Sequence, residues 1–200
     1  MTKNRIIKKE KIIKAVSSLF FEKGFSNTSI DDIIKVTGGS KRDIYKKFGN
    51  KSGFFSMIIQ TYTDEVLQEV EFEKFDENNL ELSLKKFGYA LVQSYMKPEI
   101  IGIYTMIFKE AKEFPDLAKE FYEKGPMLGT LKLSELLQNC INKGKLKKLP
   151  NYKLASFFTS ILRDKIHSRV FLNSSEPVSF EEIKEDVNLV VEIFLNGVKK

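Results

Sequence analysis

The segment from residue 28 to residue 54 constrains the fold more than any other part of this 200-residue chain. Its apolar residues recur three or four positions apart on both sides of a glycine pair, which predicts two short amphipathic helices. These residues are Ile30, Ile33 and Ile34 before the pair, and Ile44 and Phe48 after it. Gly38 and Gly39 tolerate a positive φ because they have no Cβ atom, so they predict a sharp turn. Two short helices joined by such a turn are typical of a helix-turn-helix.

The second of these helices has a start signal and a cluster of positive charge. Ser40 is placed to act as the N-cap, and Asp43 three residues later makes a weaker form of the capping box. Basic and aromatic side chains follow, on or near the face that Ile44 and Phe48 leave free. They are Lys41, Arg42, Tyr45, Lys46 and Lys47. A solvated helix face would explain the charges alone, but together with the turn they indicate a helix that binds DNA.

Positive charge is concentrated at this end of the chain. The net charge is +6, and residues 1–51 contain 13 Lys or Arg against 5 Asp or Glu, so this segment carries +8 and the remainder −2. A basic segment attracts a polyanion such as DNA, because each neutralised phosphate releases condensed counterions. An anionic membrane surface would attract the same charge. The turn therefore decides in favour of DNA.

A longer pattern covers residues 12–54. It consists of Ile12, Ala15, Phe20, Gly24, Phe25, Thr28, Ser29, Ile30 and Ile33, followed by the string GGSKRDIYKKFGNKSGF. This pattern resembles the N-terminal DNA-binding domain of TetR-family transcriptional regulators, which usually shows GVSKGTLYxHFxSKExL at the second part. Two features depart from it, since Gly39 replaces Val and the pair Arg42-Asp43 replaces a small pair. We expect the pair Arg42-Asp43 to change which bases are read.

The resemblance implies a ligand-responsive transcriptional repressor. Such a protein binds a palindromic operator in double-stranded DNA as a homodimer and leaves it when a small-molecule effector binds. The helix at residues 40–48 is expected to enter the major groove, with Thr28, Tyr45 and Lys51 on phosphates. Arg42 is the candidate for a bidentate contact to guanine. The expected DNA-binding residues are Thr28, Ser40, Lys41, Arg42, Asp43, Tyr45, Lys46 and Lys51.

The rest of the chain repeats helical spacing and contains no strand pattern of credible length. The chain is therefore expected to be all-α. We predict a three-helix DNA-binding domain at residues 1–50 and a larger helical domain for effector binding and dimerisation, of about nine helices, at residues 51–200. A long helix at about 51–72 is expected to join them. The string FKEAKEFPDLAKEFYEKGP at residues 108–126 resembles the ligand domain of the AefR-like branch of the same family.

The last two long helices, at about 152–173 and 180–199, have apolar faces wider than one packed neighbour covers. In proteins of the family that the chain resembles, these two helices pair with their counterparts in a second subunit. We therefore predict a two-fold homodimer. Its expected interface residues are Leu162, Ile166, Val170, Val187, Val191 and Phe194.

Aromatic residues are abundant after residue 60, and core packing explains most of them. In the family, the core of this helical domain also encloses an effector pocket lined by such side chains. Tyr hydroxyls on inward faces need partners when buried, so they are candidates for its polar groups. The expected pocket residues are Tyr62, Phe87, Tyr104, Phe108, Phe121 and Phe158. The expected effector is a small apolar or aromatic molecule.

Catalytic and metal-binding patterns are missing from the sequence. His167 is the only histidine, so no histidine pair for a metal and no Ser-His-Asp relay can form in one chain. No cofactor is expected, and an all-helical enzyme is disfavoured. The single Cys140 agrees with a reducing compartment, and no uncharged run approaches the ~18–20 residues of a membrane span. We expect a cytoplasmic protein. The alternative to a repressor is an activator or DNA-organising protein of the same fold without an effector pocket.

Overall fold

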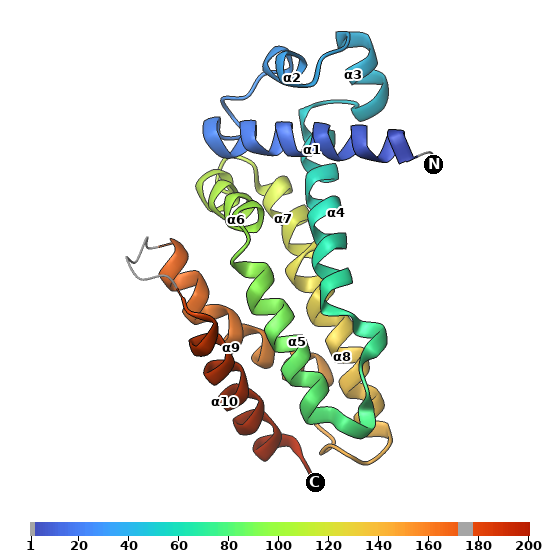
Figure 1. Cartoon of the computed structure of the whole chain (residues 1–200), viewed down its shortest axis with the longest axis vertical. Helices are drawn as coiled ribbons and strands as arrows, with labels where there is room; N and C mark the ends of the chain where they lie inside the picture. The colour runs from blue at the N-terminus through green and yellow to red at the C-terminus, as the bar shows by residue number, and fades with distance from the viewer. Residues whose placement is uncertain (1–2, 172–177) are drawn as a thin grey trace. The chain divides into compact units, whose positions relative to one another are not determined.

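The computed structural model describes residues 3–171 and 178–200, and their side chains except those of residues 3–9, 73, 165, 170 and 171. This part of the chain contains ten α-helices, two short 3-10 helices and no β-strand (Figure 1). Seven of the α-helices and both 3-10 helices follow residue 50. The all-α class predicted from helical spacing is confirmed. None of the helices in the described ranges is long and apolar enough to cross a membrane.

The helix bounds place every predicted helix within a few residues of its expected position. The α-helices are α1 (Lys3–Lys23), α2 (Ile30–Thr37), α3 (Lys41–Phe48), α4 (Lys51–Val70), α5 (Leu80–Tyr95), α6 (Pro98–Glu110), α7 (Pro115–Lys124), α8 (Pro126–Asn142), α9 (Asn151–Phe171) and α10 (Phe180–Val198). The 3-10 helices are η1 (Phe72–Lys74) and η2 (Glu77–Asn79). The predicted end of α9, at Asn173, lies outside the described residues.

The chain divides into two compact units. The first unit contains Met1–Thr63 and Gly102–Gly125, and the second contains Asp64–Ile101 and Pro126–Lys200. The first unit therefore holds α1 to α3, most of α4 and α6, and α7. The second holds the end of α4 together with α5, α8, α9 and α10.

The core of the first unit is aromatic and centres on Phe25, which is buried in the connection between α1 and α2. The Phe25 ring centroid lies 5.5 Å from that of Phe20, 5.8 Å from that of Phe55 and 5.0 Å from that of Phe114. Helix α6 packs against α1 at Gly102, where a Cβ atom would lie only 2.5 Å from the ring of Phe21. These contacts fix α6 and α4 to the helices that precede them.

The core of the second unit is formed by α5, α8, α9 and α10. Phe158 of α9 is completely buried and packs against Phe87 of α5 and Phe194 of α10, with centroid distances of 6.0 and 5.0 Å. Gly88 gives α10 room to approach α5, because a Cβ atom there would lie 2.8 Å from a methyl group of Val187. Burial of these large side chains holds the four helices together, since each contributes roughly 1.5–3 kcal/mol.

Helix α4 ends two residues before the predicted Phe72. Its last residue is Val70, and Glu71 takes the left-handed conformation with φ of 49° and ψ of 50°. The left-handed region stops an α-helix, and it is disfavoured for residues other than Gly, Asn and Asp. Helical spacing continues through Val70 and Phe72, so the amino-acid pattern does not reveal this stop.

Candidate functional site

The predicted helix-turn-helix is confirmed, since α2 and α3 flank Gly38 and Gly39 with φ of 69° and 94°. Helix α2 starts with a reciprocal capping box that the sequence analysis overlooked. The Asp32 N–H donates to Ser29 Oγ and the Ser29 N–H donates to the Asp32 carboxylate, both at 3.1 Å. These bonds from Ser29, with help from Lys23 at 3.1 Å, hold the pKa of the Asp32 carboxyl well below its usual range. The serine three residues before an acid was the signal available in the sequence.

Helix α3 begins at the predicted N-cap. The Asp43 N–H donates to Ser40 Oγ at 3.1 Å, and Ser40 Oγ donates to the Asp43 carboxylate at 2.7 Å. The Asp43 carboxylate thus orders the first turn of the helix. Ile44 is buried and anchors α3 within the first unit. A contact of Ser40 or Asp43 with DNA remains a prediction.

The outer face of α3 is exposed and positively charged. Lys41 pairs with Asp31 of α2 at 3.3 Å, and Tyr45 is 46% exposed. Arg42 and Lys46 are exposed and have no acidic partner within the described part of the chain. Their charges are therefore free for a ligand of opposite sign, and α3 holds them on a capped, anchored helix.

Thr28 and Lys51 stabilise the connection between α1 and α2. Thr28 is buried, and its hydroxyl donates to the Gly24 carbonyl at 2.7 Å. The Lys51 ammonium donates to the carbonyls of Phe25 and Ser26 at 2.6 and 3.2 Å. Burial lowers the pKa of the Lys51 ammonium. Two of its three N–H groups are used inside the protein, so its predicted phosphate contact rests on the third.

Glu110, at the end of α6, also contacts the connection between α1 and α2. No pattern in the sequence indicated this contact. The Ser26 N–H donates to both carboxylate oxygens of Glu110, at 3.1 and 3.0 Å. Glycine is favoured at position 24 because its φ is 84°, in the left-handed region, and a Cβ atom there would also approach the Glu110 carboxylate to 2.6 Å. Glu110 and Phe114 both belong to the string at residues 108–126 that resembles the AefR-like ligand domain. Within the first unit, they contact the connection that leads into the helix-turn-helix.

The residues predicted to line an effector pocket are distributed over both units. In the first unit, Tyr62 and Tyr104 are buried, and the Tyr104 ring meets Phe121 edge-on at 4.8 Å. Phe108 packs its ring 6.0 Å from that of Tyr104 but is 64% exposed. In the second unit, Phe87 and Phe158 are buried core residues. An effector contact by any of these six residues remains a prediction.

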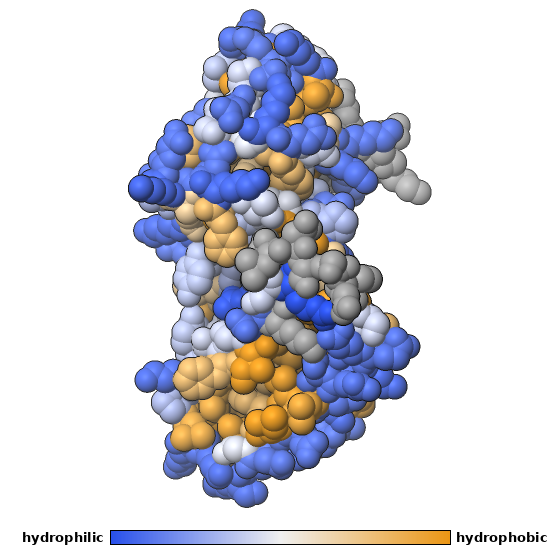
Figure 2. All heavy atoms as spheres, turned by 90° about the vertical axis from the view of Figure 1, so that its left-hand side faces the viewer, coloured by the Kyte–Doolittle hydropathy of each residue, from blue (hydrophilic) through white to orange (hydrophobic). Residues whose placement is uncertain are grey.

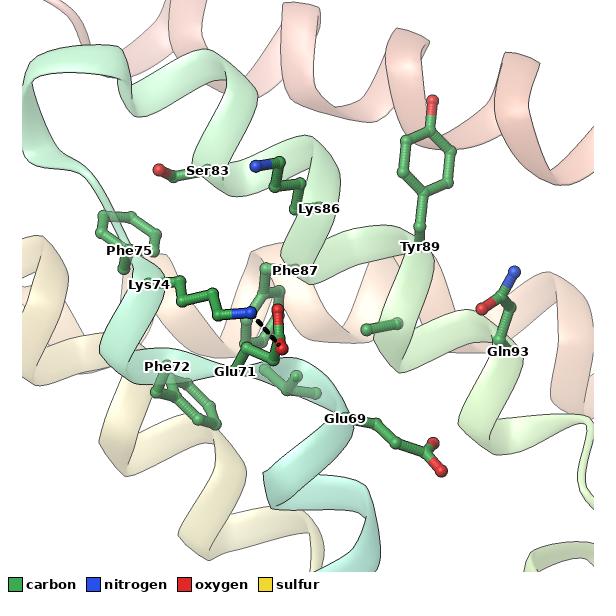
Figure 3. Close-up of a pocket in the computed structure, with 12 residues that line it drawn as sticks. Glu69, Glu71, Phe72, Lys74, Phe75, Ser83, Lys86, Phe87, Tyr89 and Gln93 are labelled. Atoms are coloured by element: carbon green, nitrogen blue, oxygen red, sulfur yellow. Dashed lines mark hydrogen bonds and ion pairs between the residues drawn. The ribbon is translucent and has the colours of Figure 1, made fainter.

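A pocket of about 340 Å³ opens in the second unit, between the end of α4, η1 and α5 (Figure 3). Of the six predicted pocket residues, only Phe87 lines it. The full lining is Glu69, Val70, Glu71, Phe72, Lys74, Phe75, Ser83, Lys86, Phe87, Tyr89, Ala90 and Gln93. Its volume lies within the usual range for small-molecule sites, roughly 300–1,000 Å³.

Five of the six residues predicted for the dimer interface pack inside the chain. Leu162, Ile166, Val187 and Val191 are buried in the core of the second unit, and Phe194 packs against Phe158. The side chain of Val170 lies outside the described residues. The same two helices present a different set of apolar side chains to solvent, each more than half exposed. These are Phe157 and Ile161 of α9, Leu189 and Ile193 of α10, and Phe180 at the start of α10. Figure 2 shows apolar surface gathered over this face of α9 and α10.

Two family models match the chain. Residues 12–58 match the model of bacterial regulatory proteins of the tetR family. Residues 82–197 match the model of the C-terminal domain of AefR-like transcriptional repressors. The first match contains α2 and α3, and the second contains the string at residues 108–126.

Curated relatives and solved structures agree with these matches. The chain is 26% identical to the uncharacterised HTH-type transcriptional regulator YfiR of Bacillus subtilis (strain 168), over 94% of this chain and 92% of YfiR. It is 23% identical to the HTH-type transcriptional repressor ComR of Escherichia coli (strain K12), over 67% of this chain but only 61% of ComR. The flavonoid-responsive regulator FrrA has a TM-score of 0.83 and 26% identity, covering 96% of this chain and 97% of FrrA. A TetR-family regulator from Mesorhizobium loti MAFF303099 shares the fold, with a TM-score of 0.82 and 24% identity over the whole of both chains.

Proposed function

Because the chain belongs to the TetR family of transcriptional regulators, with an AefR-like C-terminal domain, we propose that it is a ligand-responsive repressor acting as a homodimer on a palindromic operator. Members of this family regulate transcription and are not enzymes. The observation that carries the proposal is the exposed, unpaired charge on α3, a capped helix of a confirmed helix-turn-helix. The relative ComR is named as a transcriptional repressor, which supports repression as the activity.

In the proposed complex, α3 lies in the major groove. Arg42 pairs with guanine, a contact that discriminates between bases by roughly 1–3 kcal/mol. Lys46, Lys41 and Tyr45 neutralise or contact phosphates and set the register. The hydrogen bonds between Ser40 and Asp43 order the first turn of α3 before binding, so little conformational entropy is lost when α3 enters the groove.

The proposed homodimer uses the exposed apolar face of α9 and α10. Phe157, Ile161, Leu189 and Ile193 form two pairs spaced four residues apart, so each pair lies on one side of its helix. An isologous interface buries the same face from both subunits. The predicted interface residues whose side chains the structure describes already pack inside the protomer, so the proposed interface uses the outer apolar face instead. Two-fold symmetry then requires an operator with two inverted half-sites.

The proposed effector is a small apolar or aromatic molecule. The similar protein FrrA is named as flavonoid-responsive, which supports an aromatic ligand. Such a ligand releases DNA only if it binds the conformation with low DNA affinity more tightly than the other. We assign DNA binding to residues 1–50 and effector binding and dimerisation to residues 51–200. The protein would act in the cytoplasm, where bacterial operators are.

Selection of bound fragments from the source genome tests the proposal. Full-length protein is incubated with sheared genomic DNA, and the retained fragments are sequenced. We expect a small number of sites that share an inverted repeat close to a promoter. Occupancy of many scattered sites without a common repeat would instead favour a DNA-organising protein. Absence of any sequence preference at physiological salt would refute the assignment of α3.

A further inference from the structure

The pocket between the end of α4, η1 and α5 has an aromatic floor. Phe72 and Phe87 meet edge-on with their ring centroids 5.5 Å apart, and Val70, Phe75 and Ala90 add further apolar surface. Figure 3 shows Phe72 and Phe75 on the segment that follows α4 and Phe87 on α5. Aromatic rings in this arrangement offer faces and edges to a flat apolar group. The floor therefore suits an aromatic or other apolar body.

The charged groups of the pocket are mostly paired with one another or with neighbours. Glu71 pairs with Lys74 at 2.6 Å, as the dashed line in Figure 3 marks. Glu69 pairs with Lys97 and accepts a hydrogen bond from Ser94. Lys86 is exposed and has no acidic partner in the described part of the chain. The pocket thus contains one cation whose charge is not balanced locally.

Two of the neutral polar groups that line the pocket, Tyr89 and Ser83, already use their hydroxyl protons in hydrogen bonds within the protein. The Tyr89 hydroxyl donates to the Asn188 side-chain oxygen at 3.1 Å, so its proton is already used. Ser83 Oγ donates to the Asp76 carbonyl at 3.0 Å and accepts from the Asp76 N–H at 2.8 Å. Gln93 is exposed and lies on the same face of α5 as Lys86, two turns further along the helix. The free donors of the pocket therefore face outward beside an apolar floor.

We propose that this pocket binds a small amphipathic carboxylic acid. The apolar body of the ligand packs on Phe72 and Phe87, and its carboxylate pairs with the Lys86 ammonium. This site goes beyond the proposed repressor function, because it differs from the predicted effector residues in all but Phe87 and does not depend on DNA. A cationic ligand is disfavoured, since both pocket carboxylates already have lysine partners.

The test uses 2-naphthoate as the probe, with 2-naphthylmethanol as its uncharged counterpart, on the full chain. Binding is measured by titration calorimetry and by the fluorescence of the probe. We expect saturable binding of one naphthoate per chain and about tenfold weaker binding in Lys86→Gln, the usual loss for a charge-assisted hydrogen bond in a partly exposed site. Lys86→Arg should bind like the wild type. The alcohol should bind the wild type about as weakly as naphthoate binds Lys86→Gln.

Two further variants separate the pocket from general effects. Lys184→Gln removes another exposed charge without an acidic partner in the described residues, on α10 of the same unit and outside the pocket, and should leave naphthoate binding unchanged. Ala90→Leu adds bulk to the pocket and should abolish binding while circular dichroism shows an unchanged fold. Absence of saturable binding, equal binding of acid and alcohol, or wild-type affinity in Lys86→Gln would overturn the proposal. Release of operator DNA is a separate readout, so naphthoate binding stands even if the repressor function fails.

Discussion

Removal of the Glu110 carboxylate should loosen the connection between α1 and α2. In Glu110→Ala, the Ser26 N–H loses its charged acceptor, and hydrogen bonds to charged groups contribute about 1.5–3 kcal/mol. The bond is exposed, so water replaces the acceptor and the expected loss is near the lower limit, about 1.5 kcal/mol. For a chain of this size, each kcal/mol lowers Tm by roughly 2–4 °C, so Tm should fall by about 3–6 °C.

Two measurements check this prediction. Thermal unfolding followed by circular dichroism gives the change in Tm, and amide hydrogen exchange at Ser26 should become about tenfold faster, as about 1.4 kcal/mol corresponds to a factor of ten. Glu110→Gln keeps the size and a neutral acceptor, so its effect should be intermediate. Glu113→Ala is the matched control, because this exposed acid also lies near Lys51 but accepts no hydrogen bond from Ser26. Equal effects of the Glu110→Ala and Glu113→Ala variants would refute the reasoning.

Three further outcomes follow from the site, the apolar face and a half-buried histidine. Arg42→Ala should reduce discrimination between operator variants by roughly 1–3 kcal/mol. Lys46→Ala should instead weaken binding to all DNA sequences alike and lower the salt slope of binding by about one per subunit. Fluorescence anisotropy titrations that give the same behaviour for both variants would contradict this division. If the proposed dimer forms through this face, Ile161→Asp should give a monomer of 23.1 kDa in light scattering at micromolar concentration, and Leu82→Asp on α5 should not. Burial, with the charge of Arg163, lowers the pKa of His167 to about 4. The unfolded chain therefore binds more protons between pH 4 and about 6.5, so unfolding free energy should rise with pH in that window and His167→Gln should flatten the rise in denaturant titrations.

The helix-turn-helix was predictable because its determinants are local. The glycine pair, the Ser40 cap and the burial of Ile44 all lie within residues 28–54, and each has a recognisable spacing. Glu110 was not predictable in this way, since it reaches Ser26 across 84 residues of sequence. Spacing along one helix contains no information about which acid arrives from a distant helix. Residue types identified the family, but the structure was needed to assign the contact.

Helical spacing predicted the last two helices, but the predicted interface residues whose side chains are described lie on the inner face of each helix. Both α9 and α10 have apolar residues on two faces, because they pack in the core of the second unit and also carry an exposed stripe. Leu162 and Val187 lie on the inner face, whereas Ile161 and Leu189 lie on the outer one. Periodicity alone cannot rank two apolar faces on the same helix. The pocket was hidden for a similar reason, since it depends on the backbone of Glu71 leaving the helix.

In the proposed repressor, helices α4 and α6 would be the elements through which a ligand in the second unit acts on DNA binding. Each has residues in both units, α4 on either side of Thr63 and α6 on either side of Gly102. At their ends in the first unit, the Lys51 ammonium of α4 and the Glu110 carboxylate of α6 bind opposite backbone groups of Ser26, its carbonyl and its N–H. A rotation of either helix must therefore either break its hydrogen bond to Ser26 or move Ser26, the residue that leads into α2, along with it. Coupling of this kind requires an element with two arrangements that both ligands bias. The Glu110 variants address it directly: if that contact transmits the signal, Glu110→Ala should reduce effector-induced release of operator DNA more than Glu113→Ala does.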